Sequence, residues 1–319
     1  MKRIALLFPL ICLLAWDSVP AAKAEAVPSV CSRDNLKELT IRYLAALEAH
    51  DPSRLPLAAH VKFTENGLEL AVGKGFWLTA GKTLLKRTLI DTTNCGTYTN
   101  TVMEEKLSPT TVLSSIVIPG LKPKPLPPAG TLRPIVFAVR LKVENRKISE
   151  IETLIARESE YAFNADGFLA TKDQDWESVL PLEQRSSRLA MIAAADDYFN
   201  MFAAEPRVHT PFASSCDRWE NGTLTTAAGL LTLPGEDGKK TAMLAHVCTP
   251  KGLVISNHGP RRFLVDEEEG LVVALVHFMS MLPDAHMFKM RNGEVELINS
   301  VVGAQSKSMG WPPSALCKP

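Results

Sequence analysis

The residues whose types could do chemistry are two tyrosine and glutamate pairs. Tyr43 and Glu65 recur as Tyr198 and Glu220, 155 residues further along the chain. A carboxylate in an apolar setting has a raised pKa and can exchange a proton near neutral pH. The alternative for each glutamate is structural: it accepts hydrogen bonds that fix a strand and its turn. For each tyrosine the alternative is a core ring with a satisfied hydroxyl.

These pairs lie in a segment, Ser32 to Gly67, that recurs 155 residues later, and its clearest part is a short stretch that ends in Glu-Asn-Gly. PLAAHVKFTENG ends at Gly67, and PFASSCDRWENG ends at Gly222. From Ser32 to Gly67, nine of 36 positions are identical to those 155 residues later. Average composition would give roughly two identities by chance. The chain is therefore interpreted as two copies of one module.

A helix is expected before each repeated stretch. Apolar residues at helical spacing predict one helix over Asn35 to Ala49 and its copy over Ser187 to Ala204, with the tyrosines facing inward. The Glu-Asn-Gly ends predict a strand that runs into a turn. Glu65 shares its strand face with apolar side chains, whereas Glu220 shares its face with Cys216 and Arg218, so the two copies differ.

Each module is expected to continue as antiparallel strands. Hairpin patterns join Ile135–Val143 to Ile148–Ala156, Arg262–Val265 to Leu271–Met279, and Met287–Met290 to Val295–Val302. A further strand is expected over Val112 to Ile118. Pro119 to Pro134 contains six prolines and is expected to be an extended loop. The connection between the modules, containing Trp176, is expected to pack against them.

Composition narrows the classes of function. Lys plus Arg and Asp plus Glu each number 35, so the formal charge is zero and nothing steers the chain toward nucleic acid. Lys2, Arg3 and the apolar run that follows, with Ala22-Lys23-Ala24, predict a signal peptide over residues 1–24. We expect an exported protein, periplasmic or secreted, without a membrane anchor.

The cysteines of an exported protein are read first as disulfides. Cys216 with Cys248 is the preferred pair, and Cys31 with Cys95 would join the first module in an equivalent way, which leaves Cys317 single. No Gly-rich phosphate loop, G-x-S-x-G turn or H-E-x-x-H occurs, and we expect neither a metal nor a cofactor.

Four phrases carry a family resemblance. They are YLAALEAHDPSRLPLAAHVKFTENG (43–67), GKGFW (73–77), RLKVENRKISEIET (140–153) and RRFLVDEEEGLV (261–272). Together with the order of helix, proline link, strand and hairpins, they resemble an exported bacterial and fungal family with two nuclear transport factor 2-like, or SnoaL-like, modules. The resemblance implies an α+β fold of two tandem conical barrels, each a helix-covered, strongly curved antiparallel sheet. We divide the chain into modules at 25–158 and 187–312, a linker at 159–186 and a tail at 313–319.

The resemblance also implies an apolar pocket in each cone. By position, Tyr43 and Tyr198 resemble a tyrosine that helps form an oxyanion hole, and Asn66 and Asn221 stand where ketosteroid isomerase, an example used in general accounts of pKa tuning, has its base. Asparagine cannot take a proton, and the glutamates lie one residue earlier, on the other strand face. A steroid-isomerase mechanism is therefore not expected.

Other candidates for lining the pockets are aromatic or charged. Trp77 and Trp219 could contact a flat ring, although an aromatic side chain beside a turn also serves as a plug. Arg261, with His258 nearby, could bind an anion, but pairing of Arg261 and Arg262 with Glu267 to Glu269 is favoured. His60, His277 and His286 adjoin no other candidate.

Three hypotheses of function follow. The first is a cofactor-independent lyase, isomerase or dehydratase for a small apolar, cyclic or aromatic molecule, with Glu65 or Glu220 as acid or base and Tyr43 or Tyr198 as oxyanion donor. The second is a non-catalytic protein that binds a small apolar molecule or a partner in the same cones. The third is a double module that pairs through its sheets, as an intramolecular pseudo-dimer or a homo-oligomer.

Overall fold

The computed structural model describes residues 31–107, 128–203, 208–226, 248–249, 254 and 259–312. The predicted signal peptide, the strand predicted over 112–118, and His258 and Cys317 lie outside these residues. Within them, none of the helices combines the length and apolar character needed to cross a membrane.

The first module begins with α1 (Arg33–Glu48), which Ser32 caps at its N-terminus. A single turn of 3₁₀ helix, η1, leads into the sheet, and a second, η2, interrupts it. The elements are η1 (Pro52–Arg54), β1 (Leu57–Glu65), β2 (Leu68–Leu70), η2 (Gly75–Leu78), β3 (Ala80–Asp91), β4 (Gly96–Lys106), β5 (Leu132–Glu144) and β6 (Lys147–Ala156).

The second module repeats this order after a connection that holds α2 (Ala165–Leu169) and η3 (Leu182–Gln184). Its helix is α3 (Arg188–Asn200), capped by Ser187. Its strands are β7 (Phe212–Glu220), β8 (Thr223–Leu224), β9 (Arg262–Asp266), β10 (Leu271–Phe278), β11 (Leu282–Arg291) and β12 (Glu294–Val302).

The two sheets have the same strand order, β2-β1-β6-β5-β4-β3 and β8-β7-β12-β11-β10-β9. This confirms the α+β fold class and the tandem modules. The pairings β1–β6 and β7–β12 are parallel, so each sheet is mixed where a wholly antiparallel one was expected. The expectation of a loop from Pro119 to Pro134 is wrong at its end. Pro134 lies in β5 opposite Glu104, near the strand's start, where a missing N–H is tolerated.

Each module has its own core on the helix side of its sheet. In the first, α1 contributes Tyr43, Leu44 and Leu47 to a cluster with side chains of β1, β4, β5 and β6. In the second, α3 contributes Tyr198 and Phe199 to the corresponding cluster. Both tyrosines face inward, as their helical spacing predicted.

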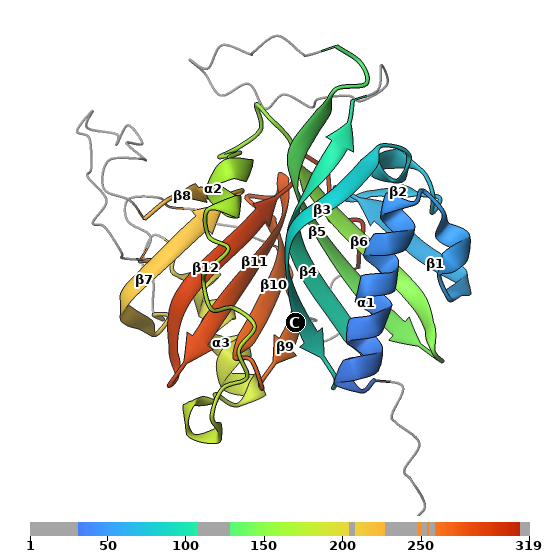
Figure 1. The fold of residues 1–319 in the computed structure, drawn as a ribbon. Coiled ribbons are helices and arrows are strands. Elements are labelled where there is room, and N and C mark those ends of the chain that lie inside the picture. The colour runs from blue at the N-terminus through green and yellow to red at the C-terminus, as the bar shows by residue number, and fades with distance from the viewer. Residues whose placement is uncertain are drawn as a thin grey trace, which may run out of the picture.

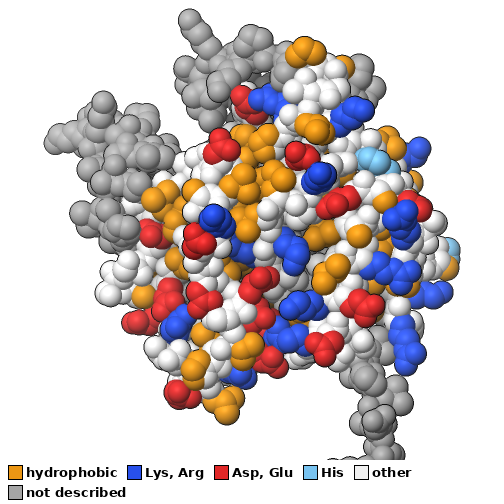
Figure 2. Space-filling model, in the orientation of Figure 1, with side chains coloured by type: hydrophobic (Ala, Val, Ile, Leu, Met, Phe, Trp, Pro, Cys, Tyr) orange, Lys and Arg blue, Asp and Glu red, His pale blue; other side chains and the backbone are white. Residues whose placement is uncertain are grey.

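A third core lies between the two sheets. Figure 1 shows the sheets side by side, and β3 of one sheet contacts β9 of the other. Leu89, Val102 and Leu154 of the first module share one buried cluster with Val273 and Met287 of the second, and the connection adds Phe168 and Trp176. The two modules thus pack through their sheets as an intramolecular pair. On the face that Figure 2 shows, acidic and basic side chains are interspersed.

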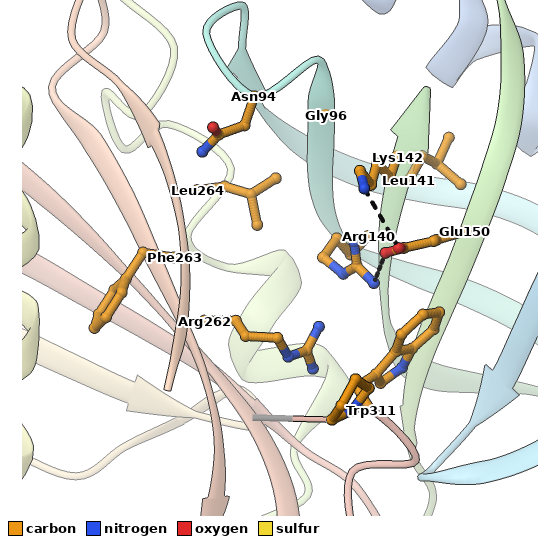
Figure 3. A pocket seen from close by; sticks show the side chains of 11 residues that line it. Asn94, Gly96, Arg140, Leu141, Lys142, Glu150, Arg262, Phe263, Leu264 and Trp311 are labelled. Atoms are coloured by element: carbon orange, nitrogen blue, oxygen red, sulfur yellow. Dashed lines mark ion pairs between the residues drawn. The ribbon is translucent and has the colours of Figure 1, made fainter. Parts of the chain in front are cut away.

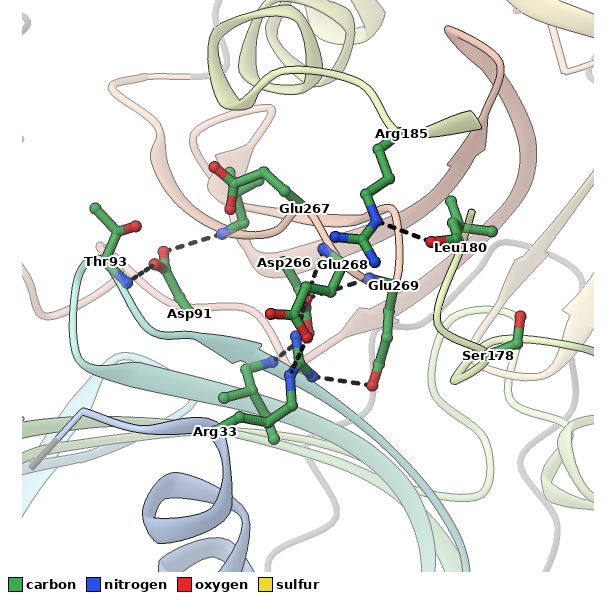
Figure 4. Close-up of polar contacts among 12 residues, drawn as sticks. Arg33, Asp91, Thr93, Ser178, Leu180, Arg185, Asp266, Glu267, Glu268 and Glu269 are labelled. Carbon is green, nitrogen blue, oxygen red and sulfur yellow. Dashed lines mark hydrogen bonds and ion pairs between the residues drawn. The ribbon is translucent and has the colours of Figure 1, made fainter. Parts of the chain in front are cut away.

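Two aspartates, one in each module, bind groups of the other module in a symmetric way, and we call them the crossing aspartates (Figure 4). Asp91, at the end of β3, accepts the N–H of Val265 at 3.0 Å and pairs with Arg188 at 2.5 Å. Asp266, at the end of β9, accepts the N–H of Ile90 at 3.2 Å and pairs with Arg33. Each carboxylate is buried and obtains its charged partner from the other module.

Loss of one crossing carboxylate should therefore destabilise the whole chain. For Asp91→Asn we expect the free energy of unfolding to fall by about 3 kcal/mol, because the partly buried Arg188 loses its close counter-charge and keeps the more exposed Glu267 at 3.8 Å. Urea denaturation followed by circular dichroism measures this. The control is Asp51→Asn, which removes the exposed partner of Arg54 and should leave the midpoint nearly unchanged. Equal shifts for both variants would contradict the role given to Asp91.

Glu269 predicts a pH dependence of stability. Burial, with the neighbouring Asp266 charge, raises its pKa from 4.5 to about 8, although Arg33 and Lys289 oppose the rise and Glu177 adds to it. The folded state therefore keeps this proton to a higher pH than the unfolded state, so this group's contribution to stability is lost as pH rises from about 4.5 to about 8. Glu269→Gln should flatten that part of the profile in urea midpoints measured across this range. An unchanged slope would show that Glu269 does not carry it.

Candidate functional site

In the first cone, the candidate residues lie inside a packed core. Tyr43 and Trp77 meet edge to face with ring centroids 5.6 Å apart, and both are buried. Phe76 packs on Phe137 at 5.2 Å. Neither the Tyr43 hydroxyl nor the Trp77 indole N–H has a hydrogen-bond partner among the described residues. Trp77 therefore fills the cone as a plug.

Glu65 points into the same cone and is held there. Its carboxylate accepts the backbone N–H of Phe76 at 2.8 Å. Burial raises its pKa; this N–H and Arg157 lower it, and Glu105 raises it further. Burial also raises the pKa of Tyr43, with a contribution from Glu65. The nearby indole N–H of Trp77 lowers the pKa of Tyr43, although the indole N–H and the Tyr43 hydroxyl do not have the geometry of a hydrogen bond.

In the second cone, the corresponding residues form a polar chain. Arg218 donates to the hydroxyl of Tyr198 at 3.1 Å, and its Nε lies 3.7 Å from Glu220. The hydroxyl of Tyr161, from the connection, donates to Glu220 at 2.9 Å. Burial raises the pKa of Tyr198 to about 12, against the lowering effect of Arg218. The neighbouring charge of Glu220, followed by burial, raises the pKa of Tyr161.

A second polar pair lies beside this chain. Asp284 and His286 are on the inward face of β11, and the imidazole Nδ1 lies 3.0 Å from the carboxylate. Burial raises the pKa of Asp284, while His286 lowers it. The imidazole packs among aromatic rings, with centroids 5.3 Å from Tyr198 and 5.1 Å from Phe199. A histidine oriented by a carboxylate in apolar walls is an arrangement suited to general base catalysis.

The two cones differ at three matched positions. Two residues before the repeated glutamate, Phe63 of the first module stands where the second has Arg218. Counting back from the ends of β5 and β11 matches Phe137 with Asp284 and Val139 with His286. The pairings Val139 with Thr153 and His286 with Ser300 agree with this alignment. The first cone is thus apolar at the three positions where the second is polar.

The repeated asparagines serve the backbone. Both have positive φ, at 46° for Asn66 and 45° for Asn221, as a two-residue Asn-Gly turn requires. The amide of Asn66 exchanges hydrogen bonds with the backbone of Ile155, and that of Asn221 does the same with Val302. The amide of Asn66 therefore fixes the end of β1 to β6, and the amide of Asn221 fixes the end of β7 to β12.

Each Asn-Gly turn also receives a segment from the other module. The connection donates the Asn164 N–H to the carbonyl of Asn221, and the Asn164 carbonyl lies against Gly222, where a Cβ atom would clash. The chain after β12 makes the same approach to Gly67 through Ser308. A glycine is needed at both turns for this close approach as well as for its φ.

The remaining candidates lie apart from the second cone's polar chain. Strand alternation places Trp219 on the face opposite Arg218. Arg261 pairs with Asp196 at 2.5 Å, and Arg262 pairs with Glu152. The expected pairing of these arginines with Glu267 to Glu269 is therefore wrong. Side chains on neighbouring elements lie closer, and Arg33 takes Glu268 and Glu269 instead.

Both expected disulfides are present, Cys31–Cys95 and Cys216–Cys248. The first joins the start of α1 to the β3–β4 turn, and the second joins β7 to Cys248. They are therefore not equivalent in the two modules. Two disulfides indicate an oxidising compartment. Within the described ranges, no group of three or more His, Cys, Asp or Glu side chains is arranged to hold a metal ion.

Sequence reasoning missed the pair Asp284 and His286, together with Tyr161. The strand was predicted to begin only at Met287, so both residues fell outside it. The signal was available: Asp-x-His followed at the same spacing by Phe288 and Met290 places all four side chains on one strand face. Nothing in the sequence indicated that Tyr161 would reach Glu220.

Comparisons with known proteins concern parts of the chain. A family described as "Domain of unknown function (DUF8021)" matches residues 184–302, which span the second module from α3 to β12. A comparison with curated proteins found no match.

Solved structures are similar over about one module. AclR from Streptomyces galilaeus, described as "a putative hydroxylase", is 11% identical, with a TM-score of 0.31, 44% of this chain covered and 95% of that chain. A "putative polyketide cyclase" from Silicibacter sp. TM1040 is 12% identical, with a TM-score of 0.29, covering 38% and 88%. IdmH from Streptomyces antibioticus, described in the same words, is 15% identical, with a TM-score of 0.23, covering 38% and 91%.

The two matched tyrosines should respond differently to loss of their hydroxyls. Tyr43→Phe removes a buried hydroxyl without a partner among the described residues, so we expect little or no loss of stability. Tyr198→Phe takes an acceptor away from the buried Arg218 and should cost about 1–3 kcal/mol. Urea denaturation of the two variants checks this. A larger loss for Tyr43→Phe would contradict the described difference between the cones.

Proposed function

We propose that the second module is a cofactor-independent acid–base catalyst, an isomerase, lyase or dehydratase, for a small apolar cyclic or aromatic molecule. The observation that carries this is the buried pair Asp284 and His286 beside the ring of Tyr198, within a cluster of aromatic and aliphatic side chains. The protein is exported in this proposal, since both disulfides suit the predicted signal peptide.

His286 is the general base in this scheme. Asp284 receives the Nδ1 hydrogen, which fixes the tautomer and leaves Nε2 with a lone pair to accept a proton from a carbon next to a carbonyl. The electron pair of the broken C–H bond moves onto the carbonyl oxygen and forms an enolate. Return of the same proton to another carbon completes an isomerisation, and departure of a β-substituent completes an elimination.

Tyr198 stabilises the enolate. Its hydroxyl accepts from Arg218, and this leaves its own hydrogen free to be donated to the developing oxyanion. The guanidinium behind the phenol strengthens that donation by its positive charge. Glu220, which the sequence suggested as an acid or base, instead balances Arg218 and receives the Tyr161 hydroxyl. It acts as a positioning residue.

The first module is the scaffold in this proposal. Phe63, Phe137 and Val139 replace the three polar side chains, so its cone lacks both the base and the cation. The connection that follows it contributes Tyr161, which reaches across to Glu220.

The test measures proton abstraction without knowledge of the natural substrate. Small cyclic ketones, such as cyclohexanone, 1-indanone and 3-cyclohexenone, are incubated with the protein in D₂O, and α-proton exchange is followed by proton NMR. We expect exchange above the buffer rate with at least one probe. His286→Gln should lower it about 100-fold. Tyr198→Phe should lower it by about 10–100-fold, and Tyr43→Phe serves as its matched control with unchanged exchange.

Two results would overturn this assignment. One is exchange that responds equally to Tyr43→Phe and Tyr198→Phe. The other is tight binding of these probes with no exchange in any variant, which would favour the non-catalytic binding protein.

A further inference from the structure

The second cone contains a disulfide beside its polar chain. Cys216 and Arg218 are two residues apart on β7 and share its inward face, and Cys248 is bonded to Cys216 within the same buried cluster. In the first module the matched positions, 155 residues earlier, hold Val61 and Phe63. The disulfide and the arginine therefore occur together in one cone, and the other cone has apolar side chains at both positions.

Arg218 is buried and is held from two sides. Its Nε donates to the hydroxyl of Thr225 at 2.9 Å. Its Nη1 donates to the hydroxyl of Tyr198 at 3.1 Å and to the carbonyl of Cys248 at 3.3 Å. Because Nη1 carries two hydrogens, each of these two acceptors takes one. The Cys248 carbonyl thus holds the guanidinium in the orientation that directs the other hydrogen to the phenol oxygen.

Glu220 is positioned to draw the same guanidinium away. Its carboxylate lies 3.7 Å from Nε of Arg218, which is longer than a close ion pair, and it accepts the hydroxyl of Tyr161 at 2.9 Å. A buried N–H that loses its acceptor is costly, and a charge-assisted hydrogen bond is stronger than a neutral one. An arginine released by the Cys248 carbonyl would therefore turn toward this carboxylate.

We propose that the Cys216–Cys248 disulfide is a positioning element of the second cone, since it fixes the Cys248 carbonyl that orients Arg218 toward Tyr198. This deepens the proposed function, and its effect on turnover rests on that function. Cys248 is 30 residues from Arg218 in sequence, and its bond to Cys216 ties its backbone to β7 beside the arginine. Without this tie, Tyr198 loses the donor that leaves its own hydrogen free for an oxyanion.

The second cone then becomes fully active only after oxidation. Two thiols, at Cys216 and Cys248, give up two electrons and two protons to an oxidant such as glutathione disulfide, which becomes two glutathione thiols. The S–S bond that forms completes the orientation of Arg218. This makes catalysis conditional on the oxidising compartment that the disulfides indicate.

The test removes each disulfide in turn and measures α-proton exchange of the cyclic ketones in D₂O. Cys216→Val with Cys248→Ala should lower exchange about tenfold. Cys31→Ala with Cys95→Ala is the matched control and should leave exchange unchanged, because that disulfide packs against a separate cluster around Leu36. Equal losses for the two double variants would overturn the proposal.

The Tyr198→Phe background distinguishes positioning from general support of the fold. Removal of Cys216–Cys248 should have no further effect on exchange there, since the disulfide acts through the Tyr198 hydroxyl. A further tenfold loss in this background would contradict the proposal, because a disulfide that only supports the fold lowers exchange in both backgrounds.

A second variant keeps both disulfides and does not depend on folding without them. Arg218→Lys retains the positive charge but has no planar fork to hold the two acceptors in their present geometry, so exchange should fall about tenfold. Exchange equal to that of the unaltered chain would show that the orientation of the cation does not matter, and the proposal would fail.

Urea denaturation separates this proposal from the catalytic one. Tyr198→Phe should lower the urea midpoint of the chain that lacks Cys216–Cys248 by less than about half as much as it lowers that of the unaltered chain, because the hydroxyl no longer meets Arg218. An equal lowering in both chains would overturn the positioning role even where exchange is observed. If the unaltered chain exchanges none of the ketones, the catalytic proposal fails and this comparison alone decides the positioning role.

Discussion

The crossing of Asp91 and Asp266 is the constraint on which the rest of this molecule depends. A buried carboxylate is costly unless its oxygens meet donors, and each of these obtains an arginine and a backbone N–H from the opposite module. Each module supplies turn N–H groups to its own aspartate, but the arginine that balances the charge comes from the other module. The apolar faces of both sheets are brought together by the same geometry, so the interface resembles a symmetric dimer joined into one chain.

Within that pair, the two cones differ in the side chains that they hold. The backbone order of the two sheets is identical, yet the second cone holds Arg218, Asp284 and His286 where the first holds apolar side chains. A cone filled by rings such as Phe137 stabilises the fold through burial. A cone with buried polar groups has less of that stabilisation.

The segments that follow the last strand of each module add further contacts between the modules. Each crosses to the Asn-Gly turn of the other module, so the turn acts both as a hairpin and as a docking point. The connection then continues past α2 and packs Trp176 against Arg87 of β3. At the matched position beside Arg262 of β9, next to Trp311, the structure has a cavity (Figure 3). The modules have the same fold, so this difference comes from the segments that follow their last strands.

The sequence by itself determined the modules. Identities at a fixed offset revealed the duplication, helical spacing placed Tyr43 and Tyr198 in the core, and the hairpins and both disulfides followed from local patterns and cysteine number. These features depend on neighbours in sequence or on composition. Strand β3 was missed because its inward and outward residues are mixed in polarity, and Arg87 is buried there only because the connection covers it.

Only the tertiary structure decided which residues share a site. Tyr161 and Glu220 are 59 residues apart, and Asp91 and Arg188 are 97 apart; their meeting depends on how two curved sheets pack. The repeated Glu-Asn-Gly suggested either a catalytic or a structural glutamate, and the geometry ties Glu220 to Arg218 and places Asp284 beside His286. The physical reason is that a strand pattern fixes which face a side chain takes, whereas its partners are fixed by the other elements on that face.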